Sequence, residues 1–205
     1  MDRSIIREIK TSLRLSMNGV TSSLMRERGV DYKLNFGVDI PRLRRMAQKY
    51  IPGKTLAEAL WKEETRELKI LATLLYPCEE FTSFEEWMSA ITNVELAEQA
   101  SVNLFSYATG AEETAFEWIL QDDLYKRLCG FSVLTRLMMQ GKQFSMEKRQ
   151  AFLAASAEAF YEENLSLKNA VLNALYRFSG QGEAEREMIR NAFSEKRELL
   201  DLLSI

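Results

Sequence analysis

Apolar residues recur every three or four positions along most of the chain, and this spacing is typical of amphipathic helices. In the first helical stretch, Ile5, Ile6, Ile9 and Leu13 fall on one side. No hairpin dipeptide stands between alternating apolar residues, so no strands are predicted. The pattern predicts an all-α protein with helices over residues 3–17, 40–51, 55–63, 65–76, 84–91, 94–108, 112–120, 123–140, 146–161, 165–179, 183–193 and 195–203.

Capping residues mark where several of these helices should begin. Asp39 precedes Ile40-Pro41, which suits an N-cap followed by proline in the first turn. A Ser or Thr followed three residues later by Glu forms a capping box, and we expect such boxes at Ser83 with Glu86 and at Thr92 with Glu95. Further helix starts are expected at Asp122, Ser145 and Asn164.

From residue 55 onwards the predicted helices fall into pairs. First helices begin near residues 55, 84, 112, 146 and 183, and second helices near 65, 94, 123, 165 and 195. A period of roughly 30–40 residues is typical of HEAT-like helical hairpins that stack into a curved solenoid with a concave groove. We expect one solenoid domain over residues 1–205, with basic N-terminal helices (1–54), HEAT-like pairs (55–180) and an acidic cap (181–205). A non-repetitive helical bundle is the alternative, because the pairs share little sequence.

The second helices of a solenoid line its inner surface, so their first turns should form a ladder of side chains there. These positions are polar or charged, which favours a binding surface: Glu67, Lys69, Glu95, Glu98, Lys126, Arg127, Lys168 and Asn169. The alternative is that each is simply the solvated face of its helix.

Composition excludes several kinds of site. The chain has no histidine, which excludes Ser-His and Cys-His nucleophile pairs and histidine zinc sites. Its two cysteines, Cys78 and Cys129, are too few for a thiolate zinc site or a disulfide framework and are expected to be free thiols. No signal peptide and no apolar run of about 20 residues is visible. We therefore expect a cytoplasmic protein that binds no metal and no membrane.

Charge is distributed unevenly along the chain. The net charge is −3, but residues 1–54 carry 12 Lys and Arg against five Asp and Glu. A local excess of this kind indicates contact with a polyanion, or merely an uneven solvated surface. Basic residues at helical spacing in this region are candidates for phosphate contacts: Arg3, Arg7, Lys10, Arg14, Arg42, Arg44 and Arg45. The alternative for the first helix is a solvated face packed on the first repeat.

Several stretches together resemble the DNA alkylation repair family of AlkD-like proteins. They are residues 36–45 (FGVDIPRLRR), Leu60-Trp61 followed by Arg66-Glu67-Leu68 and Leu71-Ala72, residues 91–99 (ITNVELAEQ), Lys126-Arg127 and residues 168–171 (KNAV). The match keeps its order from about residue 30 to 180. The resemblance implies a HEAT-like fold that holds duplex DNA in a basic concave groove. It also implies glycosylases that excise cationic alkylpurines, such as 3-methyladenine and 7-methylguanine, with no metal or cofactor.

The resemblance also implies roles for particular residues. Cleavage of an N-alkylated purine builds positive charge on the sugar, which a nearby carboxylate stabilises. Glu98 matches the catalytic Asp of the family, and Arg127 matches its DNA-contacting Arg, beside Lys126 and Lys168 as further DNA contacts. The positions of the family's Trp residues hold Val94, Leu124 and Asn173, or Ala174 in place of Asn173 if the register shifts by one, so the aromatic walls are absent. Val94 and Asn173 are expected to line the groove. Aromatic substitutes could come from Trp87, Phe105, Tyr125 or Tyr176, although helical spacing favours core or rim positions for all four.

Three functions follow as hypotheses. The first is a DNA alkylation repair protein that excises cationic N3- or N7-alkylpurines, with Glu98 as the electrostatic stabiliser. The second is a HEAT-like module that binds nucleic acid without chemistry, and the third is a scaffold that binds protein partners. If the protein has no catalytic activity, Glu95 and Glu98 have a structural role, because carboxylates stabilise the N-terminal end of a helix.

Overall fold

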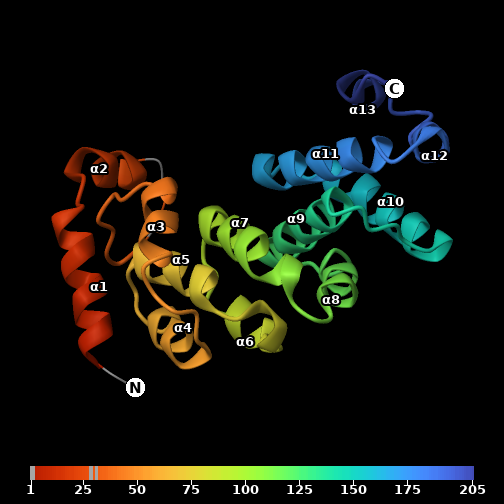
Figure 1. The fold of residues 1–205 in the computed structure, drawn as a ribbon. Helices are drawn as coiled ribbons and strands as arrows, with labels where there is room; N and C mark the ends of the chain where they lie inside the picture. Colours follow the sequence, from red (N-terminus) through yellow and green to blue (C-terminus); the bar gives the residue numbers. More distant parts are fainter. Residues whose placement is uncertain (1–2, 28–29, 31) are drawn as a thin grey trace. The chain divides into compact units, whose positions relative to one another are not determined.

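Helices account for the regular structure of the chain (Figure 1). The computed structural model describes residues 3–27, 30 and 32–205, and within this part the only β-type pairing is an isolated bridge between Leu34 and Thr65. The predicted all-α class is therefore confirmed. The α-helices are α1 (Arg3–Leu15), α2 (Gly19–Glu27), α3 (Ile40–Ala47), α4 (Lys54–Trp61), α5 (Arg66–Leu75), α6 (Phe84–Met88), α7 (Val94–Asn103), α8 (Ala111–Trp118), α9 (Leu124–Met139), α10 (Met146–Phe160), α11 (Leu165–Ser179), α12 (Glu183–Ala192) and α13 (Arg197–Leu203), with 3-10 turns η1 (Cys78–Glu80) and η2 (Phe105–Tyr107).

The predicted helix pairs are present. They are α4 with α5, α6 with α7, α8 with α9, α10 with α11, and α12 with α13, and each begins within two residues of its expected start. Contacts along the chain group these helices into two compact units. The N-terminal unit spans residues 1–109 and contains α1 to α7, and the C-terminal unit spans residues 110–205 and contains α8 to α13.

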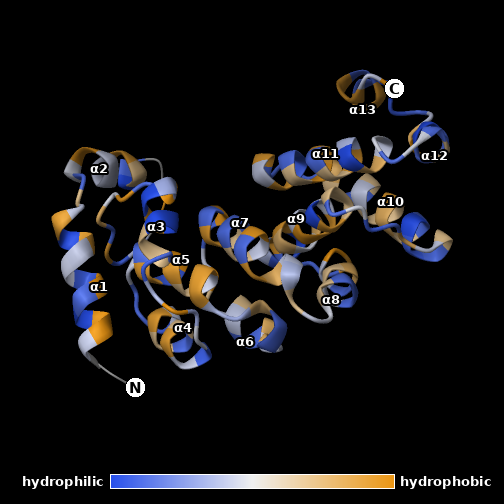
Figure 2. Ribbon diagram, viewed as in Figure 1, coloured by the Kyte–Doolittle hydropathy of each residue, from blue (hydrophilic) through white to orange (hydrophobic). Residues whose placement is uncertain are grey.

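Helix α5 is the central element of the N-terminal unit, where it packs against α3, α4 and α7. Its sequence RELKILATLL is buried along most of its length, and Leu68 and Leu71 are fully buried. Figure 2 shows α4 and α5 as largely hydrophobic helices, whereas α3 is largely hydrophilic. An aromatic cluster supports this core, since Trp61 of α4 stacks on Trp87 of α6 with ring centroids 4.2 Å apart. The burial of α5 leaves α3 with one packed side and one side rich in arginine.

Residues 32–39 connect the first helices to α3, and we call them the anchored segment. Gly37 in this segment has a φ of 71°, and a Cβ built there would lie 2.2 Å from the carbonyl oxygen of Asn18. The backbone amide of Asn18 in turn donates to the carbonyl of Phe36 over 2.9 Å. Only glycine fits this conformation and this close approach, so the segment packs tightly against the start of α2.

Helices α9 and α11 form the centre of the C-terminal unit. A Cβ at Gly130 of α9 would lie 2.9 Å from the carbonyl oxygen of Ala115, so this glycine lets α9 approach α8 closely. Phe131, Phe152 and Phe178, from α9, α10 and α11, join the three helices through consecutive ring contacts. Each unit therefore has its own apolar core.

Three predicted N-caps are confirmed by their hydrogen bonds. The carboxylate of Asp39 accepts from the amide of Arg42 over 2.7 Å, and Ser145 and Asn164 cap α10 and α11 in the same way. These contacts satisfy amides that the first turn of a helix otherwise leaves unpaired.

Two other predicted caps are displaced by one residue. Asn93 rather than Thr92 caps α7, and Asp123 rather than Asp122 caps α9, because in each pair the side chain of the second residue accepts from the amide three positions on. Ser83 does occupy the N-cap of α6, but its side chain makes no capping hydrogen bond. Adjacent polar residues compete for the cap, and the sequence alone does not decide between them.

Candidate nucleic-acid interface

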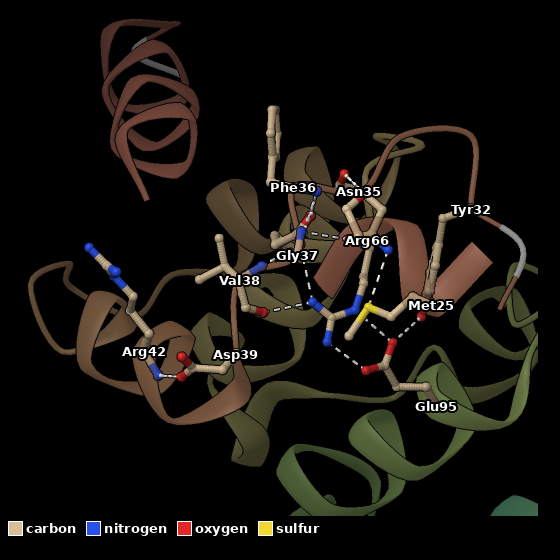
Figure 3. Close-up of polar contacts among 12 residues, drawn as sticks. Met25, Tyr32, Asn35, Phe36, Gly37, Val38, Asp39, Arg42, Arg66 and Glu95 are labelled. Atoms are coloured by element: carbon tan, nitrogen blue, oxygen red, sulfur yellow. Dashed lines mark hydrogen bonds and ion pairs between the residues drawn. The ribbon is translucent and has the colours of Figure 1, made fainter. Parts of the chain in front are cut away.

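A buried ionic network lies between α5, α7 and the anchored segment, with Arg66 at its centre (Figure 3). The guanidinium is 1% exposed and makes a bidentate contact with Glu95, over 2.8 Å from Nε and 2.6 Å from Nη2. Its Nη1 donates to the carbonyl of Val38 over 2.7 Å and to Glu67 over 3.1 Å. Burial opposes the charge of Arg66, but Glu95 and then Glu67 outweigh this effect and raise its pKa. Arg66 is not among the site residues predicted from the sequence, although a charged residue in the apolar pattern of α5 indicates that its side chain has buried partners.

Glu67 holds the anchored segment in place. Its carboxylate accepts from the backbone amides of Phe36 and Val38 over 3.1 to 3.2 Å, and the side chain is fully buried. The prediction that Glu67 lines a binding groove is therefore wrong. The Glu67 carboxylate faces the interior because two backbone amides and the Arg66 guanidinium donate to it there. Helical periodicity does not identify the two amides, because they lie about 30 residues away in the sequence.

Glu95 also has a structural role, although its side chain is 22% exposed. In addition to Arg66, it accepts from the hydroxyl of Tyr32 over 3.1 Å, and that hydroxyl lies 3.1 Å from the side-chain oxygen of Asn93 as well. Burial, and then the charge of Glu95, raise the pKa of Tyr32 above its usual range. Glu95 therefore joins α7 to α5 and to the anchored segment.

Glu98 has a different environment from Glu95. It lies one turn further along α7, on the exposed side of the helix, one turn after the half-buried Val94. Partial burial raises the pKa of Glu98, and the charge of nearby Glu95 raises it further. Glu98 remains the carboxylate of α7 that is available to a ligand, because Glu95 is already paired.

Lys69, which the sequence places along the groove, lies against the aromatic cluster. Its ammonium donates to the carbonyl of Trp61 over 2.8 Å and lies 4.7 Å from the centre of that ring. Burial lowers the pKa of Lys69. Of the aromatic residues that could replace the missing walls, Trp87 and Phe105 are in the core at 2% and 0% exposure, whereas Tyr125 is half-buried and Tyr176 is exposed.

Helix α3 carries the predicted arginines on its solvent side. Arg42, Arg44 and Arg45 are all exposed, and none of them forms an ion pair with another described residue. The carboxylate of Asp39 caps the helix through the backbone amide of Arg42, and Figure 3 shows the Arg42 side chain pointing away from the Arg66 network. These guanidinium groups are therefore positioned to contact an anion.

The basic stripe on α1 is only partly available. Arg7 and Arg14 are exposed, while Ile9 and Leu13 on the opposite side are fully buried. Lys10 is half-buried and pairs with Glu63 over 2.8 Å, so it fastens α1 to the end of α4. The side chain of Arg3 lies outside the described part of the chain.

Arg127 in the C-terminal unit is not presented to a ligand. It is 5% exposed and forms an ion pair with Glu162, which follows α10. A phosphate contact requires an exposed guanidinium. Because the Arg127 side chain is buried and paired, the structure does not support the prediction that Arg127 contacts phosphate. The helical pattern gave no indication that Glu162, 35 residues away, would neutralise this charge.

The remaining predicted residues of the C-terminal unit lie near the surface. Lys126 is half-buried and its ammonium donates to Gln121 over 2.9 Å. Lys168 is half-buried with its ammonium 5.9 Å from the ring of Phe160, and Asn173 is exposed.

Two further kinds of feature are absent from the described residues. None of the helices there is long and apolar enough to cross a membrane. No group of three or more His, Cys, Asp and Glu side chains lies in an arrangement that could hold a metal ion, among residues 3–27, 30 and 32–205.

Paired helices of this kind define the class of HEAT-like repeat proteins, and comparison with known proteins gives the family. The model of the DNA alkylation repair enzyme family matches residues 10–187, and the chain belongs to that family. A solved structure is similar over 92% of this chain and 82% of its own, with a TM-score of 0.80 and 19% identity. That protein is from a family related to the HEAT-like repeat DNA glycosylases with affinity for branched DNA structures. The search of curated proteins finds no match.

Proposed function

We propose that this protein binds DNA through backbone phosphates and prefers branched DNA. The observation that carries the proposal is the row of exposed, unpaired arginines on α3, in a region with a large excess of basic residues. Phosphate contacts need exposed cations and release counterions, which gives affinity that does not depend on sequence. The structural neighbour's affinity for branched DNA supports the choice of ligand. Duplex DNA, the ligand expected from the sequence, is the weaker ligand in this proposal.

The environment of the candidate catalytic residues favours binding over excision. Val94, Leu124 and Asn173 stand where the resemblance places aromatic side chains, and none can stack on a cationic base. Arg127 is buried and paired with Glu162. Among the positions that the resemblance assigns to excision, Glu98 carries an exposed carboxyl group.

A competition between DNA forms tests the proposal. Fluorescence anisotropy would compare a four-way junction with a straight duplex of equal length, at increasing salt. We expect tighter binding to the junction and an affinity that falls linearly with salt on logarithmic axes. Equal affinity for both forms would remove the preference for branched DNA. A lack of salt-dependent binding to either form would overturn DNA binding and leave the protein-interaction scaffold.

Excision of cationic alkylpurines is a second candidate function, which the exposed carboxylate of Glu98 favours. That carboxylate would stabilise the positive charge that develops on the sugar as the base leaves, and would orient the attacking water. The test is release of 7-methylguanine from duplex DNA under single-turnover conditions by wild type, Glu98→Gln and the control Glu117→Gln, at an exposed position of α8. Loss of release only in Glu98→Gln supports excision, and no release by wild type rejects it.

A further inference from the structure

A pocket of about 520 Å³ opens between the second half of α1 and the solvent side of α3. We call it the α1–α3 pocket. No acidic side chain is among the described residues that line it, which are Ser12, Leu15, Ser16, Arg42, Arg45, Met46 and Lys49. Serine hydroxyls lie on the α1 wall, and cations lie on the α3 wall. This composition is that of a site for an anion.

The three cations of the pocket share one side of the helix and its continuation. Arg42, Arg45 and Lys49 are spaced by three and then four residues, which places them above one another. All three are exposed, and none forms an ion pair with another described residue. By contrast, Lys10 of α1 is neutralised by Glu63. The pocket therefore keeps three uncompensated positive charges around one cavity.

The remaining walls of the pocket are fixed by packing. Met46 is 6% exposed and forms an apolar base between the cations. Tyr50, next to Lys49, donates its hydroxyl to Glu8 of α1 over 3.1 Å, which ties the end of α3 to α1. Both walls of the pocket belong to elements that pack against each other. The backbone positions of the three cations are therefore fixed before any ligand binds.

Arg44 lies on a different side of α3 from the pocket. This residue lies two positions after Arg42 and therefore about 200° around the helix, on another side of α3. One straight stretch of backbone approaches a helix from one side, so it would contact either Arg44 or the pocket. DNA whose arms leave in different directions can contact both.

We propose that the α1–α3 pocket binds a phosphate group of the DNA backbone, on a different strand segment from the one that contacts Arg44. The inference rests on the proposed function and deepens it by assigning a particular phosphate site. Two guanidinium groups can each give a bidentate hydrogen bond to phosphate oxygens, and Lys49 adds a point charge. The same chemistry would also accept free phosphate, and the test separates the two sources.

The test uses two triple variants with the same change in charge. The pocket variant is Arg42→Gln, Arg45→Gln and Lys49→Gln. The control variant is Lys62→Gln, Arg177→Gln and Arg197→Gln, which removes three exposed cations elsewhere. Circular dichroism melting would establish that both variants fold. We expect the pocket variant to bind the four-way junction at least about tenfold more weakly, and its logarithmic salt slope to fall by about one, because one phosphate contact is lost. The control variant should keep its slope.

Titration with inorganic phosphate, followed by amide NMR shifts at Ser12, Ser16 and Met46, forms the second arm. Sodium chloride at matched ionic strength provides the reference. Saturable shifts in wild type that the pocket variant loses, with unchanged junction binding in both variants, would assign the pocket to free phosphate instead of DNA. Junction binding that falls equally in the two variants, or remains unchanged in both with no phosphate shifts, would overturn the pocket. If wild type binds no DNA, the proposed function fails and the phosphate titration alone decides the pocket.

Discussion

Glu67 and Arg66 carry opposite charges into the interior of the N-terminal unit, where water cannot solvate them. The loss of solvation is offset only because each charge has several donors or acceptors, including the amides of Phe36 and Val38 and the carbonyl of Val38. Removal of one partner therefore costs more than the pair itself contributes. The role of these two residues is structural, although both lie next to the candidate interface.

Glu67→Ala should lower the free energy of unfolding by about 3–5 kcal/mol, because it leaves two amides and a buried guanidinium short of an acceptor. Urea unfolding followed by circular dichroism measures the change. Glu64→Ala is the matched control, since Glu64 pairs with Lys33 on the surface and should cost less than about 1 kcal/mol. Equal effects of the two substitutions would contradict the buried network.

Glu98 should make the folded state less stable as pH rises. Its pKa is raised by partial burial and by Glu95, so the folded state holds this proton more tightly than the unfolded state does. Stability attributable to Glu98 is therefore lost between the ordinary pKa of a glutamate and the raised one. At pH 7, Glu98→Gln should have a higher Tm than wild type, by no more than about 2 °C because solvent screens an exposed group. Near pH 4 the two proteins should have the same Tm.

Melting curves at several pH values, with Glu117→Gln on α8 as the comparison, measure this effect. A Glu98→Gln protein whose advantage is the same at every pH would show that ionisation of Glu98 does not affect stability.

At the scale of elements, the anchored segment joins α2, α5 and α7 without being a helix or strand itself. Its position depends on side-chain contacts from Ser22 of α2 and Glu67 of α5, and on the left-handed backbone at Gly37. The segment ends at Asp39, the N-cap of α3. It therefore determines where the arginines of α3 begin.

Gly37→Ala should destabilise the protein by more than about 3 kcal/mol, because the new Cβ would meet the Asn18 carbonyl at 2.2 Å in addition to the left-handed strain. Gly141→Ala separates these two causes. Gly141 also has a positive φ, of 86°, but its Cβ would meet nothing within 4 Å, so we expect a loss of only about 1–2 kcal/mol. Thermal unfolding of both variants gives the comparison, and similar losses would rule out the steric contact.

The elements that the sequence predicts well are those with local signals. Helix pairs from α4 onwards follow from periodicity, and the caps at Asp39, Ser145 and Asn164 follow from residue type. Helix α2 was missed because its sequence GVTSSLMRE is rich in residues of low helix propensity, and tertiary contacts hold it, including the bond from the Ser22 hydroxyl to the Asn35 carbonyl.

The candidate site was harder to predict than the fold for a related reason. Helical periodicity identifies which positions can be polar, but a charge becomes buried or available according to partners far away in sequence. Glu67 and Arg127 look like Glu98 and Arg42 in the pattern, yet the first two are neutralised inside the protein and the last two are not. Pairing across 29 to 35 residues leaves no local mark.

At the scale of the whole molecule, the net charge of −3 conceals a basic N-terminal region and an acidic remainder. In the proposed complex with DNA, the acidic remainder would repel DNA while the basic contacts attract it. Long-range repulsion mainly changes the rate of association, whereas direct contacts mainly change the rate of dissociation. Exposed glutamates remote from the basic region in sequence, such as Glu195 and Glu198, can test this separation.

The double variant Glu195→Gln and Glu198→Gln should associate with junction DNA a few times faster at low salt, with an unchanged dissociation rate. Stopped-flow fluorescence measures both rates, and the acceleration should vanish at high salt, where screening removes long-range repulsion. A slower dissociation rate would instead show that these glutamates lie in direct contact with DNA.

The contacts of Glu67 with the anchored segment have a consequence for hydrogen exchange. Amides in loops usually exchange with deuterium quickly, because water reaches them without unfolding. The amides of Phe36 and Val38 are bound to a carboxylate that is fully buried, so they can exchange only when the network around Arg66 opens. We therefore expect these two loop amides to be protected as strongly as those in the middle of α5, and to lose that protection together.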